Sequence, residues 1–242
     1  MKSLSGSVAI VTGASKGFGR EIALQLAAEG VKVVVAARSA APLAALADEI
    51  KLAGGTAVAR AVDLRDPGQC AALVEWTAAE MGRLDILVNN AGLGHWGALE
   101  TMTDAEWRET MEVNVDAIFY LCKAAIAPMR KRGSGHIVNI ASVAGRRGVP
   151  HMAAYGASKA AVIVFSEGLA GELKKDGIQV SIISPGTGAS DFRATHTKRP
   201  MDGNLTDPDR MLVPGDVACA VVWTLKSSGH VQLVHAIVEP RG

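Results

Sequence analysis

Two side chains that can exchange protons stand four residues apart in Ala153–Ala161, a stretch otherwise built from small residues. Tyr155 carries a phenol and Lys159 an ammonium group, and an α-helix would bring residues at this spacing onto one face. A free phenol titrates near pKa ~10, and a neighbouring positive charge lowers that value, so the pair could deliver a proton at neutral pH. The pattern is weak by itself, because Tyr155 could equally be an aromatic side chain packed on a helix.

A glycine-rich segment near the start of the chain gives a second chemical signal. The apolar run at 7–13 predicts a buried strand, and the chain passes from it through Thr12–Gly19 into a segment of helical period. In such a unit the first glycine permits a tight turn, the second a close approach to a pyrophosphate, and the third close packing of helix on strand. Gly13, Gly17 and Gly19 stand at these positions. Free N–H groups at the helix start would then contact the phosphates of a dinucleotide.

The end of the next predicted strand favours NADPH over NADH. A site for NAD usually has Asp or Glu here, which accepts hydrogen bonds from the adenosine ribose. This chain instead reads Ala36-Ala37-Arg38-Ser39, without a carboxylate. Arg38 can pair with a 2′-phosphate, and Lys16 in the glycine-rich segment adds a second positive charge. The alternative for Arg38 is a solvated arginine at a strand end.

Strands and helices alternate in a way that predicts the fold class. Short β-branched runs alternate with Ala- and Leu-rich segments of helical period. We expect strands at 7–13, 32–38, 57–64, 84–92, 135–142, 178–186 and 231–239, and helices at 19–30, 41–54, 67–81, 104–131 and 153–175. This alternation predicts one α/β domain over residues 1–242, with a doubly wound, seven-stranded parallel sheet and helices on both faces. Residues 188–213 lack a period, and we interpret them as a substrate-binding lid, the alternative being a floppy surface insertion.

Composition narrows the classes of partner. The 242 residues include 25 basic and 24 acidic side chains, a net charge of +1 that gives no reason to expect nucleic acid or an anionic membrane. No apolar stretch approaches the roughly 20 residues of a membrane span. The cysteines, Cys70, Cys122 and Cys219, lie far apart without metal-ligand spacing. We therefore expect a cytoplasmic protein with reduced, buried thiols, no metal and a small-molecule substrate.

These segments together resemble the short-chain dehydrogenase/reductase family. The resemblance rests on the glycine-rich segment, NNAG at 89–92, Ser142, Tyr155-x-x-x-Lys159 and Pro185-Gly186, which occur in the family's order over essentially the full length. It implies a Rossmann-type fold and the NADP(H)-dependent reduction of a carbonyl to an alcohol, or the reverse. It also implies a homodimer or homotetramer that pairs through the helices at 104–131 and 153–175.

The resemblance assigns catalytic roles to Asn114, Ser142, Tyr155 and Lys159. Hydride delivery to a carbonyl carbon builds negative charge on the oxygen, which needs a hydrogen-bond donor and finally a proton. By the family's pattern Ser142 holds that oxygen and Tyr155 donates the proton. Lys159 lowers the pKa of the phenol, and Asn114 holds a water that links the lysine to solvent. Each of three residues also has an ordinary structural alternative: an N-cap for Ser142, a polar helix residue for Asn114 and a surface lysine for Lys159.

The same resemblance implies the cofactor contacts. Asp63 and Leu64 would flank the adenine ring, and Asn90, Ala91 and Gly92 would support the cofactor and the central strand. The remaining expected contacts are Gly13, Ser15, Lys16, Gly17, Phe18, Gly19, Arg38, Tyr155, Lys159, Pro185, Gly186, Gly188 and Ser190. Ser190 stands where the family more often has threonine, and this difference keeps the hydroxyl.

Five conspicuous side chains mark the expected substrate end, namely His95, Trp96, Arg146, Arg147 and His151. An arginine there could bind a substrate carboxylate or phosphate, but adjacent loop arginines are often simply solvated. Trp96 suits either an apolar pocket wall or a subunit contact.

Two subfamilies of reductase remain open. Much of the core is similar to 3-oxoacyl-acyl-carrier-protein reductases, which usually end in a glycine-rich segment, whereas this chain ends HVQLVHAIVEPRG. Residues 214–240 look like the C-terminal pattern of NADP-dependent reductases and hydroxy-acid dehydrogenases, so we favour a small or medium carbonyl compound as substrate. Basic residues for a carrier protein exist, interrupted by Asp176: Arg130, Lys131, Arg132, Lys174 and Lys175.

Two further classes fit less well. A non-catalytic NADP-binding regulator would not need the Tyr155 and Lys159 pair. A hydrolase with Ser142 as nucleophile would need a Gly-x-Ser-x-Gly elbow, and the residues around Ser142 do not form one.

Overall fold

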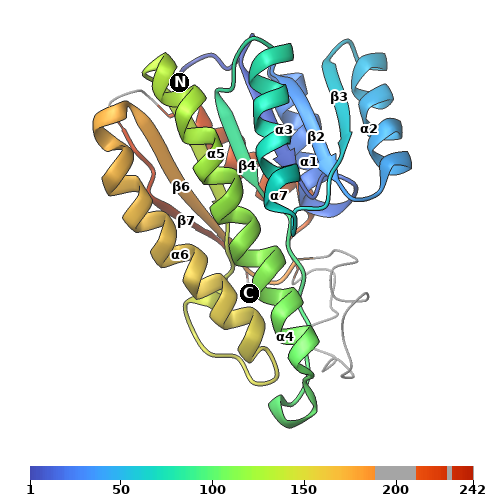
Figure 1. The fold of residues 1–242 in the computed structure, drawn as a ribbon, viewed down its shortest axis with the longest axis vertical. Coiled ribbons are helices and arrows are strands. Elements are labelled where there is room, and N and C mark those ends of the chain that lie inside the picture. The colour runs from blue at the N-terminus through green and yellow to red at the C-terminus, as the bar shows by residue number, and fades with distance from the viewer. Residues whose placement is uncertain (189–210, 228–230, 242) are drawn as a thin grey trace.

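A seven-stranded parallel sheet forms the centre of the described part of the chain (Figure 1). The computed structural model describes residues 1–188, 211–227 and 231–241. The strands are β1 (Val8–Thr12), β2 (Lys32–Ala37), β3 (Thr56–Ala61), β4 (Ile86–Asn89), β5 (Gly135–Ile140), β6 (Ile178–Pro185) and β7 (His235–Val238). They lie in the order β3-β2-β1-β4-β5-β6-β7, every pair parallel. The predicted doubly wound sheet is confirmed, and each strand lies within one residue of its expected range.

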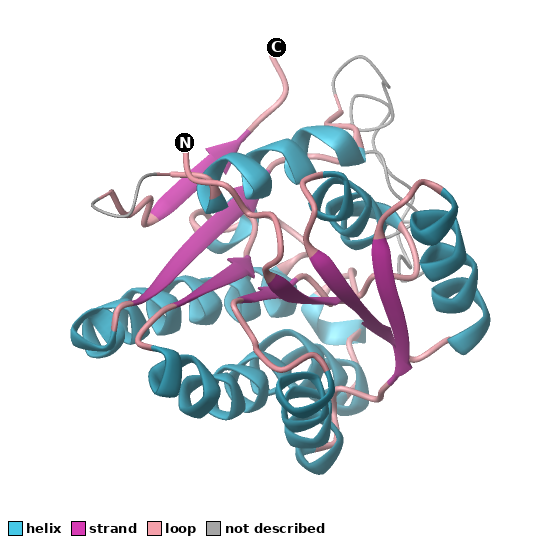
Figure 2. Ribbon diagram, turned by 90° about the horizontal axis from the view of Figure 1, so that it is seen from above, coloured by secondary structure: helices cyan, strands magenta, loops and turns pink. Residues whose placement is uncertain are grey.

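Helices cover both faces of this sheet (Figure 2). They are α1 (Gly17–Ala28), α2 (Ala40–Leu52), α3 (Pro67–Glu80), α4 (Asp104–Met111), α5 (Ala117–Arg132), α6 (Ala153–Leu173) and α7 (Pro214–Leu225). One apolar core forms between the sheet and α1, α2 and α7, and a second between the sheet and α3, α5 and α6.

Alternation along each strand divides the apolar side chains between the two cores. In β2, Val33 and Val35 belong to the core beneath α1, and Val34 belongs to the core beneath α3. Successive strand residues point to opposite faces, so a strand covered on both sides must be apolar at nearly every position. This requirement explains the unbroken β-branched runs that identified the strands.

The sequence predicted one helix over 104–131, and the structure divides it into α4 and α5. A turn of π-helix, Glu112–Asp116, separates the two. In a π-turn the backbone hydrogen bonds run from i to i+5, which inserts an extra residue and changes the face that the following helix presents. Asn114 lies within this turn, so the interruption coincides with a candidate catalytic residue.

Helix α7 was not among the predicted elements, although its start carries recognisable signals. Pro214 stands in its first turn, and the carboxylate of Asp216 accepts a hydrogen bond of 2.8 Å from the backbone N–H of Val213. The predicted lid at 188–213 lies mostly outside the described residues. Of its two ends, Gly188 and Leu212 are joined by a parallel β-bridge.

The cysteine prediction is correct for two of the three residues. Cys70 and Cys122 are buried and free, but Cys219 is exposed. Helix α7 buries Val217, Ala218 and Val221 against the sheet, and Cys219 lies on its outer side. Burial raises the pKa of the Cys122 thiol to about 12. Among the described helices, none has the length and apolar character needed to cross a membrane.

Candidate active site

A cavity of about 630 Å³ opens at the carboxyl ends of the strands. It forms where β1 pairs with both β2 and β4, the point at which the strand order reverses and where doubly wound sheets bind ligands. Most of the predicted cofactor residues line it: Gly13, Ser15, Lys16, Gly17, Phe18, Arg38, Asp63, Leu64, Asn90, Ala91, Gly92, Pro185, Gly186 and Gly188. Ser142, Tyr155 and Lys159 line the same cavity. Ser190 lies outside the described residues.

The glycine-rich loop is held tightly against the segment after β4. Gly13 and Gly17 have φ angles of +65° and +57°, in the left-handed region that favours glycine. A Cβ on Gly13 would lie 2.8 Å from the Cα of Ala91. A Cβ on Gly19, which does not line the cavity, would collide with the Asn90 amide and the Gly13 carbonyl. At Gly13 and Gly19 the loop therefore has room for backbone only.

Hydrogen bonds between β1 and the end of β4 fix this packing. The Oγ1 of Thr12 donates to the carbonyl of Val88 at 3.3 Å and accepts from the backbone N–H groups of Asn90 and Ala91 at 3.0 and 3.1 Å. The side-chain amide of Asn90 donates to the carbonyl of Thr12 at 2.9 Å. The first two residues of the NNAG motif thus join β4 to both of its neighbours: Asn90 bonds to Thr12 of β1, and Asn89 donates to Asn139 of β5 at 2.8 Å.

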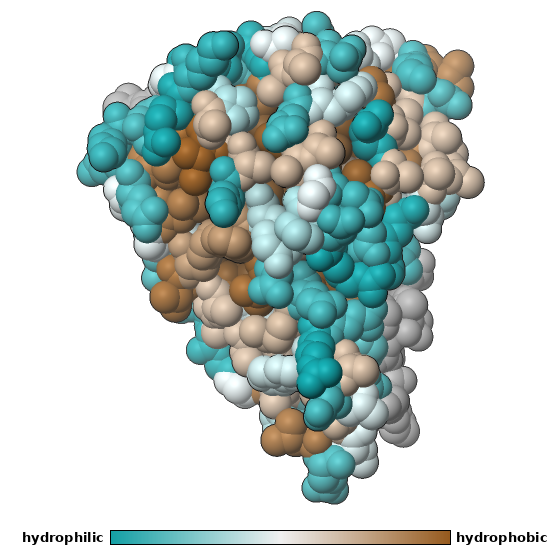
Figure 3. All heavy atoms as spheres, in the orientation of Figure 1, coloured by the Kyte–Doolittle hydropathy of each residue, from teal (hydrophilic) through white to brown (hydrophobic). Residues whose placement is uncertain are grey.

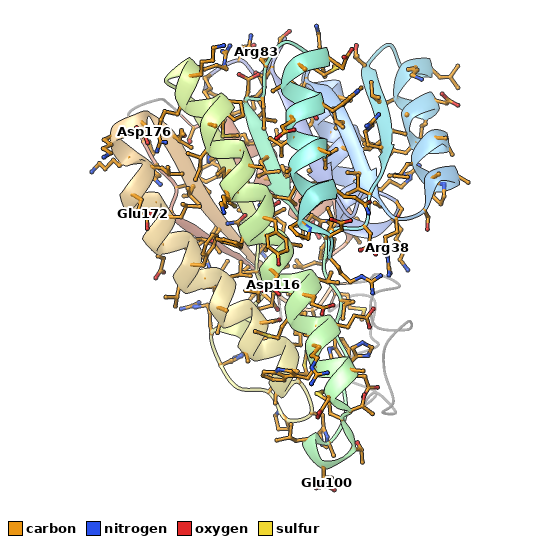
Figure 4. The ribbon with its side chains drawn as sticks, in the orientation of Figure 1. Arg38, Arg83, Glu100, Asp116, Glu172 and Asp176 are labelled. Carbon is orange, nitrogen blue, oxygen red and sulfur yellow. The ribbon has the colours of Figure 1, made fainter. Side chains whose placement is uncertain are left out.

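Positive charge gathers at the end of the cavity near β2. Lys16 and Arg38 are exposed side chains on its wall, and Figure 4 shows Arg38 at the end of the strand, pointing outward. Asp63, also on the wall, is engaged by Arg65, whose Nη2 lies 2.6 Å from Oδ2. This bond holds the pKa of Asp63 below its usual range. Asp63, which shares this wall with Arg38, is therefore ionised and already paired.

Ser142 serves as an N-cap and keeps its proton for another partner. It begins a short 3₁₀ turn, Val143–Gly145, and its Oγ accepts from the backbone N–H of Ala144 at 3.2 Å. A serine hydroxyl has one O–H donor besides its lone pairs, so capping leaves the donor available to the cavity. Ser142 can therefore act as an N-cap and as a hydrogen-bond donor to a substrate oxygen at the same time.

Small residues let this turn pack directly on the first turns of α6. A Cβ on Gly145 would lie 2.6 Å from the backbone carbon of Lys159, and one on Gly156 would lie 2.9 Å from the carbonyl oxygen of Ala144. Any larger side chain at Gly145 would separate Ser142 from the helix that carries Tyr155 and Lys159.

Lys159 is buried, so the surface-lysine alternative is wrong. Its side chain crosses from α6 to β5, where Nζ donates to the carbonyl of Ile140 at 2.9 Å, and the residue is only 3% exposed. Nζ lies 5.8 Å from the ring centre of Tyr155. Burial lowers the pKa of Lys159 to about 8. A desolvated ammonium beside the phenol is the arrangement that stabilises a phenolate.

Asn114 is fully buried in the π-turn and does not line the cavity. Its Nδ2 donates to the carbonyl of Leu93 and to the Oγ of Ser158, at 2.8 and 2.9 Å, while its Oδ1 accepts from the N–H of Leu93 at 2.8 Å. Ser158 in turn donates to the carbonyl of Tyr155 at 2.7 Å. The side chain of Asn114 therefore ties the loop after β4 to the Tyr155 turn, and its role toward a water stays a prediction.

The substrate end differs from the expected set of residues. Trp96 lines the cavity and lies edge-on to Tyr155, with ring centres 6.2 Å apart. His95 does not line it, because its Nε2 lies 2.8 Å from the carboxylate of Glu109 on α4. Arg146 and His151 are exposed and do not line the described cavity either. Arg147 does, and it lies 3.9 Å from Glu239.

The short chain dehydrogenase family model matches residues 7–200. This chain belongs to that family. It is 40% identical over 181 residues to the 3-oxoacyl-[acyl-carrier-protein] reductase FabG of Escherichia coli, covering 75% of this chain and 73% of that one. It is 37% identical to an uncharacterized oxidoreductase of Staphylococcus saprophyticus, over 99% of this chain and all of the other. A metagenomic short-chain oxidoreductase crystallised with NADP has a TM-score of 0.86 and 36% identity over the full length of both chains.

Two residues of this short-chain dehydrogenase escaped the sequence prediction. Thr12 joins β1 to the segment after β4, and Ser158 connects Asn114 to the backbone of Tyr155. Both stand inside motifs that were quoted, the glycine-rich segment and the Tyr155 stretch. The signal for Thr12 was a hydroxyl at the carboxyl end of a predicted central strand, and the signal for Ser158 was a hydroxyl one residue before Lys159.

Proposed function

We propose that this oxidoreductase reduces a small or medium carbonyl or hydroxy-acid-related compound with NADPH, or runs the reverse oxidation, with Tyr155 as general acid and base. The observation that carries the proposal is the meeting of Ser142, Tyr155 and the buried Lys159 in the cavity that the glycine-rich loop also lines. A regulator that only bound a nucleotide would have no use for a desolvated lysine beside a phenol.

Each catalytic side chain has a defined task in this proposal. When bound, NADPH supplies the hydride for the carbonyl carbon. The free O–H of Ser142 donates to the substrate oxygen, and the phenol of Tyr155 delivers the proton. Lys159, held by the carbonyl of Ile140, keeps a positive charge 5.8 Å from the phenol ring. Asn114 and Ser158 hold the backbone from which Tyr155 projects.

Three features support NADPH rather than NADH. Lys16 and Arg38 stand on the cavity wall at the end of β2, and Ala36 and Ala37 offer no carboxylate to the ribose. Asp63 is paired with Arg65. The metagenomic oxidoreductase of similar structure was crystallised with NADP.

The runner-up substrate is a 3-oxoacyl group on an acyl carrier protein, which the likeness to the Escherichia coli reductase favours. That likeness spans three quarters of each chain, whereas the likeness to the uncharacterized oxidoreductase spans nearly all of both. The basic residues considered for a carrier protein lie at the far ends of α5 and α6. Since α5 has 16 residues, they stand about 24 Å from the catalytic end of that helix. We therefore favour the free carbonyl compound.

A substrate panel with both cofactors tests the proposal. The panel should pair simple ketones and aldehydes with 2-oxo and 3-oxo acids, and each 3-oxo acid with its thioester. We expect NADPH oxidation with at least one free carbonyl compound. Activity confined to thioesters would favour the runner-up, and no NADPH oxidation with any member would reject the reductase and leave the regulator.

Assembly and location are further proposals. Apolar side chains gather over α5 and α6 in Figure 3, where Phe119 and Val164 are 45% and 69% exposed. This face supports a homodimer or homotetramer paired through these helices. The free thiols of Cys70, Cys122 and Cys219 support a cytoplasmic location. Sedimentation equilibrium of the purified protein measures the assembly, and a Val164→Glu variant should shift it toward the monomer.

A further inference from the structure

A second cavity lies at the amino-terminal edge of the sheet. Its volume is about 620 Å³, and its wall includes the start of three strands at Ile86, His136 and Ile178. Arg83 lines it, and Figure 4 shows Arg83 at the end of the molecule opposite Glu100, with Arg38 between those two ends. The described linings of the two cavities share no residue, so this cavity is separate from the one at the carboxyl ends of the strands.

Cationic side chains dominate its lining. Among the described lining residues four are cationic and one is a carboxylate: Lys2, Arg83, Arg132 and Lys174 against Asp85. The whole chain has a net charge of only +1, so this excess is local. The cavity therefore favours a ligand with more than one negative charge.

Asp85 anchors the two arginines without using up their donors. It accepts from Nε and Nη2 of Arg83, at 2.6 and 2.8 Å, and the Nε of Arg132 lies 3.3 Å away. Asp85 is itself held by the backbone N–H of Val8 at 2.8 Å. A guanidinium has five N–H donors, so both arginines keep donors for another acceptor. Fixed guanidinium groups of this kind suit the bidentate binding of phosphate.

Two further polar residues, Lys2 and His136, belong to the wall. Partial burial lowers the pKa of Lys2, which has no carboxylate partner among the described residues. His136 is 3% exposed, and its Nε2 lies 2.9 Å from the Oγ of Ser181, which donates to the carbonyl of Leu233. Nε2 therefore carries the proton, and Nδ1 is a buried acceptor with no partner in the described part of the chain.

We propose that this cavity binds a phosphate group, either as free hydrogen phosphate or as the phosphate of a small metabolite. The guanidinium and ammonium groups pair with its oxygens. The volume is in the range of ordinary ligand sites, so it accommodates a metabolite as well as the free ion. The proposal is independent of the catalytic assignment.

Calorimetric titration of inorganic phosphate into the NADPH-saturated protein tests it, in a chloride buffer of low ionic strength. Bound NADPH keeps phosphate away from Arg38 and Lys16, so one saturable site per chain is expected. An Arg132→Gln/Lys174→Gln variant should bind phosphate at least about tenfold more weakly, since it loses two charge-assisted contacts. The matched control, Lys131→Gln/Lys175→Gln, removes the same charge from the same helix ends at residues outside the cavity wall, and it should bind as the parent does.

Two outcomes would overturn the proposal: no saturable binding up to about 10 mM phosphate, or equal weakening by both variants. Glycerol 3-phosphate distinguishes the two sources of the group. Tighter binding than inorganic phosphate indicates a phosphorylated metabolite, and weaker binding indicates the free ion. Thermal unfolding checks that the variants are folded, and the single Lys174→Gln change at an exposed residue provides the same test if the double variant is not.

Discussion

The two cavities at opposite ends of the sheet are nearly equal in volume, about 630 and 620 Å³, and among the described residues each wall has four Lys or Arg side chains and one carboxylate. In the first cavity these charges stand beside the backbone of the glycine-rich loop, and one of them, Lys159, is buried. In the second cavity the carboxylate, Asp85, pairs with two of the cations, Arg83 and Arg132. Lys159 shows the contrast best, because burial lowers its pKa to about 8, whereas Lys174 at the other end is exposed. The two ends therefore differ in the burial of one cation, Lys159, and not in the number of charges on their described walls.

Helices α5 and α6 and strand β5 are among the elements that connect the two ends. Helix α5 begins beside the turn of Asn114 and ends at Arg132, and α6 runs from the Tyr155 turn to the residue before Lys174. Strand β5 begins with Gly135 and His136 and ends at Ile140, whose carbonyl accepts from Lys159. Variants at one end therefore provide controls for the other within a single fold.

The Tyr155→Phe variant should give the largest effect and separate the two ends completely. It removes the proton donor and keeps the ring that lies against Trp96, so turnover should fall about 10²–10⁴-fold. NADPH binding should stay within a few-fold, and phosphate binding at the second cavity should not change. Steady-state kinetics and fluorescence titration measure these quantities. Turnover close to that of the parent would remove Tyr155 from the mechanism.

Lys159 should make the stability of the cofactor-free protein rise with pH. Its pKa is about 8 when folded and 10.5 when unfolded, so between these values the unfolded chain binds more protons. Stability is therefore lowest below about pH 8 and rises by about 3 kcal/mol as the pH approaches 10.5.

Urea unfolding of the parent and of a Lys159→Met variant at pH 7.5 and 10 isolates this contribution, because the other titrations cancel in the difference. A Lys174→Met variant at the opposite end is the matched control and should keep the parent's pH dependence. If the Lys159→Met variant keeps it too, the ammonium is not desolvated.

The parts of the site that a local pattern determines were predictable. Gly13 and Gly17 were found because a turn with positive φ restricts the residue type, and Lys159 because a helix fixes its distance from Tyr155. Thr12 and Ser158 were missed because their partners depend on which strand and which helix pack beside them. Residue spacing carries no information about such long-range neighbours.

At the substrate end, long-range neighbours also could not be predicted from residue spacing. His95 stands next to Trp96 in the sequence, and the loop suggested that both face the pocket. In the structure the carboxylate of Glu109 on α4 lies 2.8 Å from the His95 ring. The histidine therefore packs against α4 and does not line the cavity. The π-turn around Asn114 was also unpredictable, because residues 104–131 keep a helical composition through the interruption.

Gly145 and Gly148 test how closely the Ser142 turn must pack on α6. A Cβ on Gly145 would lie 2.6 Å from the carbon and 2.8 Å from the oxygen of the Lys159 backbone, whereas one on Gly148 would meet nothing within 4 Å. Gly145→Ala should lower the free energy of unfolding by about 1–3 kcal/mol and reduce turnover. Gly148→Ala should change the free energy by less than about 0.5 kcal/mol. Equal changes in the free energy of unfolding for the two variants would mean that the turn can move away from α6 without losing stability.

The smallest expected effect concerns Arg38, and it decides whether the catalytic end also recognises phosphate by charge. Arg38→Ala should weaken NADPH binding about tenfold and leave NADH binding nearly unchanged, because only NADPH carries the 2′-phosphate. Arg60→Ala is the matched control. Arg60 lies on the neighbouring strand β3, its guanidinium carbon stands 4.2 Å from the ring centre of Trp76 on α3, and it does not line the cavity. Fluorescence titrations with both cofactors provide the four affinities. If Arg38→Ala weakened both cofactors equally, its charge would act on the whole dinucleotide, and phosphate-specific recognition would be confined to the amino-terminal edge.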